Sequence, residues 1–249
     1  MKKLVILPAL IALAAPFAAH AQAVSPAITA ALADPARPEA DRARDTARHA
    51  GEILAFAGVK PGDKVGDFIM GGGYWTRILA RAVGDTGRVW AYQPAEFIKF
   101  NADYAEQQKT AVAPYANVTA ASDSLATYSF PEPLDVILTV QNYHDLHLKM
   151  SPPGFAAVMA KRLFDSLKPG GVFLVVDHVA NADPGFAAPD SLHRIDPAAA
   201  RKEIESAGFV FDGELSLLRN AEDPHTASVF DPSIRGKTDQ FVYRFRKPD

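Results

Sequence analysis

The sequence predicts an α/β fold: a mainly parallel sheet with helices on both faces, completed by a C-terminal antiparallel strand pair. Apolar runs bounded by turn residues alternate with segments of helical spacing along most of the chain. This alternation favours parallel strands joined by helical crossovers. The strand runs are almost continuously apolar, as expected of strands buried on both faces. Segments 209–218 and 240–246 instead alternate apolar and polar residues, which indicates the antiparallel pair.

The elements of the first half follow from local patterns. A helix begins at Pro38, where acids and arginines lead into an apolar run, and it ends at Gly58 before the turn KPGD. The apolar run Lys64–Met70 predicts a buried strand. Helical spacing then predicts a helix over Trp75–Val83, and the turn GDTG separates it from a second strand over Arg88–Tyr92.

The second half repeats this alternation. A helix is expected over Phe97–Ala111, followed by a short strand at Asn117–Ala120. The turn SFPEP precedes the most continuous apolar run, which predicts a central strand over Asp135–Val140. The remaining elements are a helix over Phe155–Leu167 that ends at KPGG, a strand over Val172–Asp177, and a helix over Pro197–Ala207 that ends at Gly208.

The length of 249 residues, with no internal repeat, fits one sizeable domain. We place that domain at residues 41–249, with the helix that begins at Pro38 as an N-terminal lid. Residues 24–40 are rich in Ala, Pro and Ser. This composition predicts a linker that carries a short helix.

Residues 1–23 differ in kind from the rest of the chain. MKK provides a basic start, LVILPALIALAAPFAA an apolar core, and AHAQA the small residues of a cleavage site. This combination is typical of a bacterial secretory signal peptide. Cleavage after Ala21 or Ala23 would give a periplasmic or secreted protein. A membrane anchor is the alternative, but the prolines and the short core argue against a stable span.

The composition narrows the range of functions. The chain has no cysteine, which excludes disulfides, thiolate metal sites and a cysteine nucleophile. Its formal net charge is −3, and no basic stripe suggests a nucleic-acid partner. No second apolar run is long enough to cross a bilayer. We therefore expect a small-molecule partner and no stable membrane insertion after cleavage of the leader.

Three consecutive glycines, Gly71–Gly73, lie between the first predicted strand and the helix that follows it. Such a turn presents backbone N–H groups at the carboxyl edge of the sheet, where open α/β folds bind ligands. A phosphate loop would need Lys-Ser or Lys-Thr after the last glycine, and a dinucleotide fingerprint would need glycine at Thr76 and an acid at Gln93. The remaining interpretation is a nucleoside ligand with an amino-acid tail and no phosphate.

In this stretch the chain resembles motif I of the class I S-adenosylmethionine-dependent methyltransferases, written approximately V-L-D-L-G-x-G-x-G-Y-x-T. The residues in register are Val65, Asp67, Gly71, Gly73, Tyr74 and Thr76. The likeness continues through LARAVGDTGRVWA, LDVILTVQNYHD and LKPGGVFLVVDH, over roughly residues 50–246. More narrowly, GGGYWTRILA, NYHD and GKTDQFVYRFRKP are similar to an exported bacterial group known as predicted methyltransferases.

The resemblance implies a Rossmann-like, seven-stranded sheet, S-adenosyl-L-methionine as cofactor, and methyl transfer to an unidentified small acceptor. The chain departs from the motif at two positions. Ile69 stands where the first glycine is usual, and Gln93 stands where an acid usually meets the ribose hydroxyls. Glu96, one turn later, could take the place of that acid.

The resemblance also assigns the cofactor-binding residues. Asp67 would meet the methionine amine, and the glycines Gly71, Gly72 and Gly73 would let the backbone approach the cofactor. Tyr74 could place its ring near the sulfonium, although packing is the ordinary role of an aromatic residue there. The other assigned positions are Gln93 or Glu96 for the ribose, Asp123 with Ser124 for the adenine amino group, and Asn142 at the edge of the sheet.

The segment QNYHDLH directly follows the central strand, so its polar residues should lie at the carboxyl edge, facing the transferred methyl group. We expect His144 to act as a general base when the acceptor must lose a proton. Asp145 would orient it, and Tyr143 is the third candidate catalytic residue. The alternative is a loop histidine bonded to the backbone.

Several side chains that can bind a metal through nitrogen or oxygen should also lie at this edge. Their spacing matches no recognised metal-binding motif, so no metal is predicted. The residues concerned are His144, Asp145, His147, Asp177, His178 and His193. Two other functions stay open. One is a non-catalytic protein that binds a nucleoside or another small ligand on the same scaffold. The other is a metal-dependent hydrolase.

Overall fold

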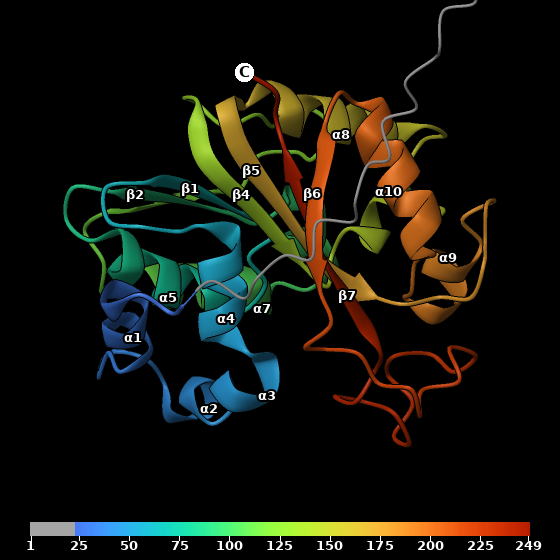
Figure 1. Ribbon diagram of the computed structural model, residues 1–249, viewed down its shortest axis with the longest axis horizontal. Helices are drawn as coiled ribbons and strands as arrows, with labels where there is room; N and C mark the ends of the chain where they lie inside the picture. The colour runs from blue at the N-terminus through green and yellow to red at the C-terminus, as the bar shows by residue number, and fades with distance from the viewer. Residues whose placement is uncertain (1–22) are drawn as a thin grey trace, which may run out of the picture.

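The computed structural model describes residues 23–249, which form one seven-stranded sheet in the order β3-β2-β1-β4-β5-β7-β6. The pairs among β1 to β5 are parallel, whereas β7 runs antiparallel to both β5 and β6. This is the predicted sheet with its C-terminal antiparallel pair (Figure 1). The strands are β1 (Lys64–Phe68), β2 (Arg88–Tyr92), β3 (Val118–Ala121), β4 (Leu134–Val140), β5 (Leu167–His178), β6 (Val210–Leu215) and β7 (Gln240–Arg246).

The helices cover both faces of the sheet (Figure 1). Several begin or end where the sequence predicts: Pro197 opens α10 behind an Asp196 cap, and Gly58, with φ +77°, ends α4. The helices are α1 (Pro26–Leu32), α2 (Glu39–Arg42), α3 (Asp45–Arg48), α4 (Ala50–Ala57), α5 (Tyr74–Val83), α6 (Ala95–Phe100), α7 (Asp103–Val112), the 3₁₀ helix η1 (His144–His147), α8 (Phe155–Asp165), α9 (Ala188–Leu192) and α10 (Pro197–Ser206).

Two apolar layers hold the helices against the sheet. Val172, Leu174 and Val176 of β5 pack with α1, α4 and α5 on one face. Phe173 and Val175 of the same strand pack with α8 and α10 on the other. Because successive side chains of a strand point to opposite faces, a continuously apolar β5 is buried on both sides. The parallel part of the sheet therefore sits in the middle of three layers.

The N-terminal segments differ from the predictions. The single helix expected from Pro38 to Gly58 is three segments, α2, α3 and α4. His49 separates α3 from α4 because it adopts a left-handed conformation with φ +47°. The expected linker at residues 24–40 contains α1, whose buried Ile28 and Ala31 pack into the core with α5. This segment is therefore part of the folded unit.

Two further boundaries were predicted wrongly. The helix expected over 97–111 divides into α6 and α7 because Asn101 is extended. KPGG was expected to be a turn after α8, but it lies within β5, which begins at Leu167 opposite Leu134. Among the described residues, no helix is long and apolar enough to span a membrane. The predicted leader lies outside the described residues.

Candidate functional site at the carboxyl edge of the sheet

The glycine turn follows β1 at the carboxyl edge. Ile69 (φ +64°), Gly71 (φ +53°) and Gly73 (φ +79°) all have left-handed backbone conformations. The position where the motif usually has its first glycine therefore does need a positive φ, and a β-branched residue there costs about 1–2 kcal/mol. The buried Ile69 side chain packs in the core, and Asn142 Nδ2 donates to the Ile69 carbonyl at 2.9 Å. Asn142 thus braces the turn.

Gly71 and Gly73 have different surroundings. A Cβ added at Gly71 would meet no atom within 4 Å, whereas one added at Gly73 would lie 2.3 Å from Ala111 Cβ on α7. Gly71 therefore leaves open space above the turn. Gly73 allows α7 to pack closely against it. A Cβ on Gly72 would lie 3.5 Å from Gln107 Oε1, an ordinary contact.

Asp67 lies under the turn, fully buried. Its Oδ2 accepts a hydrogen bond from Thr76 Oγ1 at 2.6 Å, which ties β1 to the first turn of α5. Burial raises the pKa of Asp67 to about 6, and the hydrogen bonds from Thr76 only partly offset this. In the described structure Asp67 thus holds the turn in place from below.

The raised pKa of Asp67 predicts a pH-dependent stability. The pKa of about 6 in the folded protein lies above the ordinary aspartate pKa of 3.8, so as the pH rises the folded protein keeps this proton longer than the unfolded chain. Stability should therefore be higher below pH 4 and fall as the pH rises from 4 to 6. Asp67→Asn removes the charge and should gain roughly 2–3 kcal/mol relative to wild type between pH 4 and 7. Urea unfolding across this pH range measures the difference.

Asp165→Asn, which changes a half-exposed carboxylate paired with Lys161, is the control for Asp67→Asn. Its stability relative to wild type should barely change with pH. If Asp67→Asn raised the free energy of unfolding by the same amount at pH 4 and at pH 7, the raised pKa of Asp67 would be contradicted.

Gln93 and Glu96, the residues expected at the ribose, are both hydrogen-bonded to other groups of the protein. Gln93 is fully buried, and its Oε1 accepts a hydrogen bond from the Gly71 N–H at 2.9 Å. Its Nε2 has no hydrogen-bond partner among the described residues. Glu96 accepts bonds from the Ser124 hydroxyl at 2.6 Å and from the Leu125 N–H at 2.9 Å. Partial burial tends to raise the pKa of Glu96, but the hydrogen bonds from Leu125 and Ser124 outweigh it and lower the pKa.

The segment after β3 lies next to these residues. Tyr92 donates a hydrogen bond to the Asp123 carbonyl at 3.1 Å, and the Tyr92 ring stacks on Tyr128. The Asp123 side chain is exposed. The structure therefore brings Gln93, Glu96, Asp123 and Ser124 to one part of the edge, as expected, with Glu96 and Ser124 bonded to each other.

Tyr74 faces the N-terminal helices. Its hydroxyl donates to Asp45 Oδ1 at 2.7 Å, and the guanidinium groups of Arg44 and Arg48 lie 5.0 and 4.7 Å from its ring centroid. Asp45 also forms an ion pair with the buried Arg37. Tyr74 thus anchors α3 to the start of α5, and its ring already has cationic partners.

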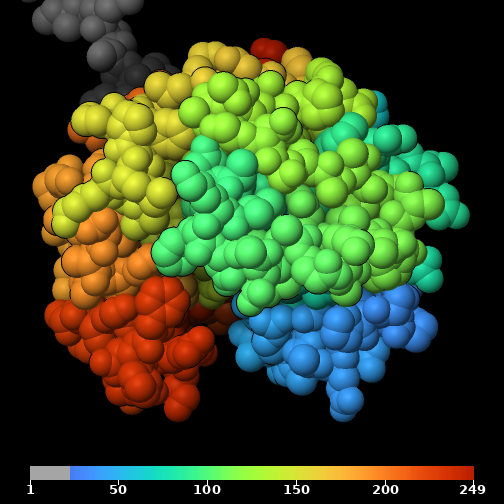
Figure 2. Space-filling view, turned by 180° about the vertical axis from the view of Figure 1, so that it is seen from behind, coloured from blue at the N-terminus to red at the C-terminus, as the bar shows by residue number. Residues whose placement is uncertain are grey.

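A cavity of about 530 Å³ opens at the carboxyl edge, within the size range of small-molecule sites. It is lined by Glu96 and Phe97 after β2 and by Asn142 and His144 after β4, so it spans the end of β1 between them. Phe230 and His178 line both this cavity and an adjoining one of about 540 Å³. Figure 2 shows the surface hollowed where the red C-terminal loop meets the green and blue segments.

The rim of this cavity is apolar. Phe100, Met150 and Phe230 are strongly exposed, and all three line it. Exposed apolar side chains gathered at one opening indicate a binding surface. The sequence did not predict these three residues, because a single apolar residue at the end of a helix or in a loop carries no local signal of exposure.

His144 lies in the wall of the cavity, held by Asp177 at the end of β5. The His144 backbone N–H donates to Asp177 Oδ2, and its Nδ1–H donates to Oδ1, both at 2.8 Å. Burial alone lowers the pKa of His144, but the charge of Asp177 and this bond outweigh it and raise the pKa to about 9. At neutral pH the ring is mostly charged. The expected general base is therefore better suited to donating a hydrogen bond.

Burial also shifts the pKa values of two ionisable groups next to His144. Burial raises the pKa of Asp145 to about 6, and burial lowers the pKa of His178 to about 4. His178 Nδ1 is bonded to Thr238 Oγ1 at 2.7 Å. His178 is therefore neutral at neutral pH.

Tyr143 does not join this site. Its buried ring packs in the core, and its hydroxyl donates to Glu203 Oε1 on α10 at 2.7 Å. His147 also contacts Glu203, at 3.1 Å. The prediction that Tyr143 is a catalytic residue was wrong, because its side chain, directly before η1, points toward Glu203 on α10 and away from His144.

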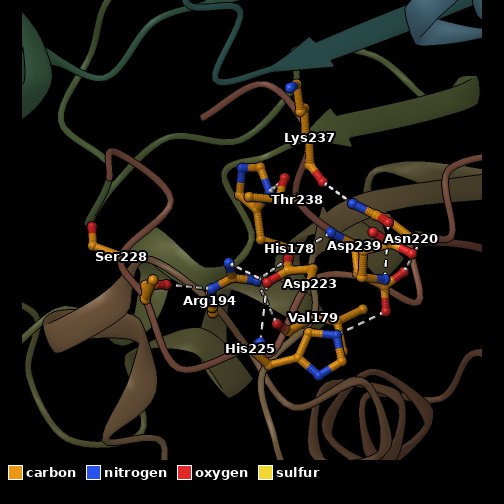
Figure 3. Close-up of polar contacts among 12 residues, drawn as sticks. His178, Val179, Arg194, Asn220, Asp223, His225, Ser228, Lys237, Thr238 and Asp239 are labelled. Carbon is orange, nitrogen blue, oxygen red and sulfur yellow. Dashed lines mark hydrogen bonds and ion pairs between the residues drawn. The ribbon is translucent and has the colours of Figure 1, made fainter. Parts of the chain in front are cut away.

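A buried ion pair fixes the loop of residues 216–239, which carries Phe230. Arg194 and Asp223 are both fully buried and form two bonds, of 2.8 and 3.0 Å (Figure 3). Arg194 also donates to the carbonyls of Val179 and Ala227. Nothing in the sequence marks Asp223 as the partner of Arg194.

The comparisons with known proteins identify the fold. No protein-family model matches the chain, and no curated protein matches its sequence. A SAM-dependent methyltransferase from Aquifex aeolicus is similar in structure, with TM-score 0.56 at 20% identity over 88% of this chain and 96% of that one. A TehB-like SAM-dependent methyltransferase from Corynebacterium glutamicum has TM-score 0.53 at 12% identity, over 84% and 95%.

A third similar structure is described as a possible exported protein from Bordetella parapertussis, with TM-score 0.51 at 14% identity over 83% of this chain and 68% of that one. At these identities the likeness concerns the fold alone. The chain has the seven-stranded, Rossmann-like fold of the class I methyltransferases.

Proposed function

We propose that the protein is an S-adenosylmethionine-dependent methyltransferase that acts on a small acceptor with an apolar body. The observation that carries the proposal is the turn at Gly71. It leaves open space at the end of β1, next to a cavity lined by residues that follow β2 and β4. Open α/β sheets bind nucleoside ligands at this place.

The residues around the turn fit such a cofactor in two respects. Gln93 Nε2 is a buried donor with no partner among the described residues, and an unpaired buried donor is costly unless a ligand satisfies it. The exposed carboxylate of Asp123 lies in the segment after β3, where it could accept a bond from an amino group. Asp123 would therefore bind the adenine amino group, and the Gln93 side chain would have to turn toward the cavity to bond the ribose.

The cofactor would supply an electrophilic methyl group on a sulfonium. Methyl transfer depends chiefly on positioning and on excluding water. The apolar rim of Phe100, Met150 and Phe230 would cover the acceptor. His144, with its proton at Nε2 and its Nδ1–H held by Asp177, would donate a hydrogen bond to an acceptor oxygen. An acceptor that presents an anionic oxygen would need no general base.

Calorimetric titration of the purified protein with S-adenosylhomocysteine tests the cofactor proposal. We expect a Kd of about 1–100 μM, and Gly71→Val should weaken it by more than about tenfold because the side chain would enter the open space. Gly84→Val is the matched control: Gly84 also has a positive φ and nothing within 4 Å of an added Cβ, but it lies at the opposite end of α5. No binding at millimolar ligand to the folded protein would refute the proposal.

A non-catalytic binding protein on the same scaffold is the second candidate. Ile69 and Gln93 favour it, since both depart from the motif at positions next to the turn. Export, predicted from residues 1–23, also favours it, because the methyl donor is made in the cytoplasm. Binding of S-adenosylhomocysteine without methyl transfer to any acceptor would support this candidate.

A further inference from the structure

Three side chains meet at one point of the cavity wall. His144 Nε2 lies 3.3 Å from His193 Nδ1 and 3.3 Å from Asp145 Oδ1, and the last two atoms are 3.8 Å apart. All three residues line the cavity of about 530 Å³. Within the described residues, these are three potential metal-ligand atoms at mutual distances below 4.8 Å.

The spacing of these three atoms fits the ligand shell of a metal ion. Ligand atoms bound tetrahedrally to Zn²⁺ at about 2.0–2.1 Å lie about 3.3–3.4 Å apart. Two of the three distances have this value, and the third is somewhat longer. Two imidazoles and one carboxylate favour a first-row transition ion over Mg²⁺ or Ca²⁺, which prefer oxygen ligands.

Neighbouring contacts and backbone conformation orient the two histidines of this group. Because His144 donates its Nδ1–H to the fully buried Asp177, its Nε2 is the nitrogen directed at the other two ligand atoms. Metal-binding histidines usually donate their second ring N–H to a carboxylate in this way. His193 follows α9 in a left-handed conformation with φ +53°, which positions it beside His144.

We propose that His144, Asp145 and His193 form a binding site for one divalent transition-metal ion, with the remaining coordination position open to the cavity. Sites with three protein ligands and one open position are typical of catalytic rather than structural zinc. The open position would take an oxygen atom of the small ligand whose apolar part contacts Phe230 and Met150. A bound ion would displace the Nε2 proton of His144 and would take over the contact with the ligand oxygen that the proposed function gives to His144. Binding of the methyl donor at the Gly71 turn does not involve this atom, so the cofactor site and the metal site can each fail alone.

Calorimetric titration of chelator-treated protein with Zn²⁺, and visible absorption with Co²⁺, test this site. We expect one ion per chain with a Kd of about 1 μM or below, and the intense Co²⁺ absorption of a four- or five-coordinate site. His193→Ala should weaken binding by more than about 100-fold. The His193 side chain is about a third exposed, so the variant should fold, which its thermal unfolding will verify. Asp177→Asn should weaken binding by about 10–100-fold.

His147→Ala is the matched control. His147 belongs to the same short helix as His144, but its Nε2 contacts Glu203, so metal affinity should stay within about twofold of wild type. Two results would overturn the site: no Zn²⁺ or Co²⁺ binding to the folded protein, or binding that His193→Ala leaves unchanged.

Discussion

Replacing Arg194 with alanine is expected to lower the free energy of unfolding by about 3–5 kcal/mol, because it leaves the buried carboxylate of Asp223 without its counter-ion. The side chains of Arg194 and Asp223 are both fully buried, and two hydrogen bonds join them (Figure 3). Two backbone carbonyls, of Val179 and Ala227, would lose their donor as well. Urea denaturation of the variant and the wild type measures the loss.

Arg219→Ala is the matched control for Arg194→Ala. Arg219 also makes two bonds to an aspartate of this network, Asp239, but its side chain is half exposed. Exposed ion pairs contribute about 0–1 kcal/mol, so this variant should change stability little. Equal losses for the two variants would show that burial of the Arg194 pair does not dominate its contribution.

Gly73→Ala is expected to cost about 2–5 kcal/mol. The residue has φ +79°, which costs a non-glycine residue about 1–2 kcal/mol. Its Cβ would also lie 2.3 Å from Ala111 Cβ and 2.9 Å from Arg77 Nη1, and overpacking typically costs about 1–3 kcal/mol more. α7 would have to move away from the turn. Urea unfolding reports the total loss.

Gly71→Ala separates the two contributions to the Gly73 effect. Gly71 lies in the same turn with φ +53°, but an added Cβ would meet nothing within 4 Å. Only the conformational cost of about 1–2 kcal/mol should remain. If Gly71→Ala destabilised the protein as much as Gly73→Ala, close packing against α7 could not be the reason for glycine at position 73.

Local sequence patterns predicted much of the fold. β2 and β7 have the predicted bounds, and β1, β4 and α5 differ from prediction by no more than two residues at either end. The apolar runs of β1 and β4 give this information because these central strands are buried on both faces. The predictions failed where one backbone angle decides the outcome, as at His49, whose positive φ divides the expected lid helix. Nothing near His49 in the sequence signals that conformation.

For the candidate site, the sequence determined which residues reach the carboxyl edge of the sheet, because the ends of parallel strands meet there. It placed Asp67, Gln93 and His144 correctly in this sense. Their contacts depend on the tertiary structure: Tyr143 points to α10, and His193 approaches His144 from 49 positions further along the chain. Periodicity reports which face of an element is buried, whereas contacts between distant side chains depend on loop conformations that pack only in the complete fold.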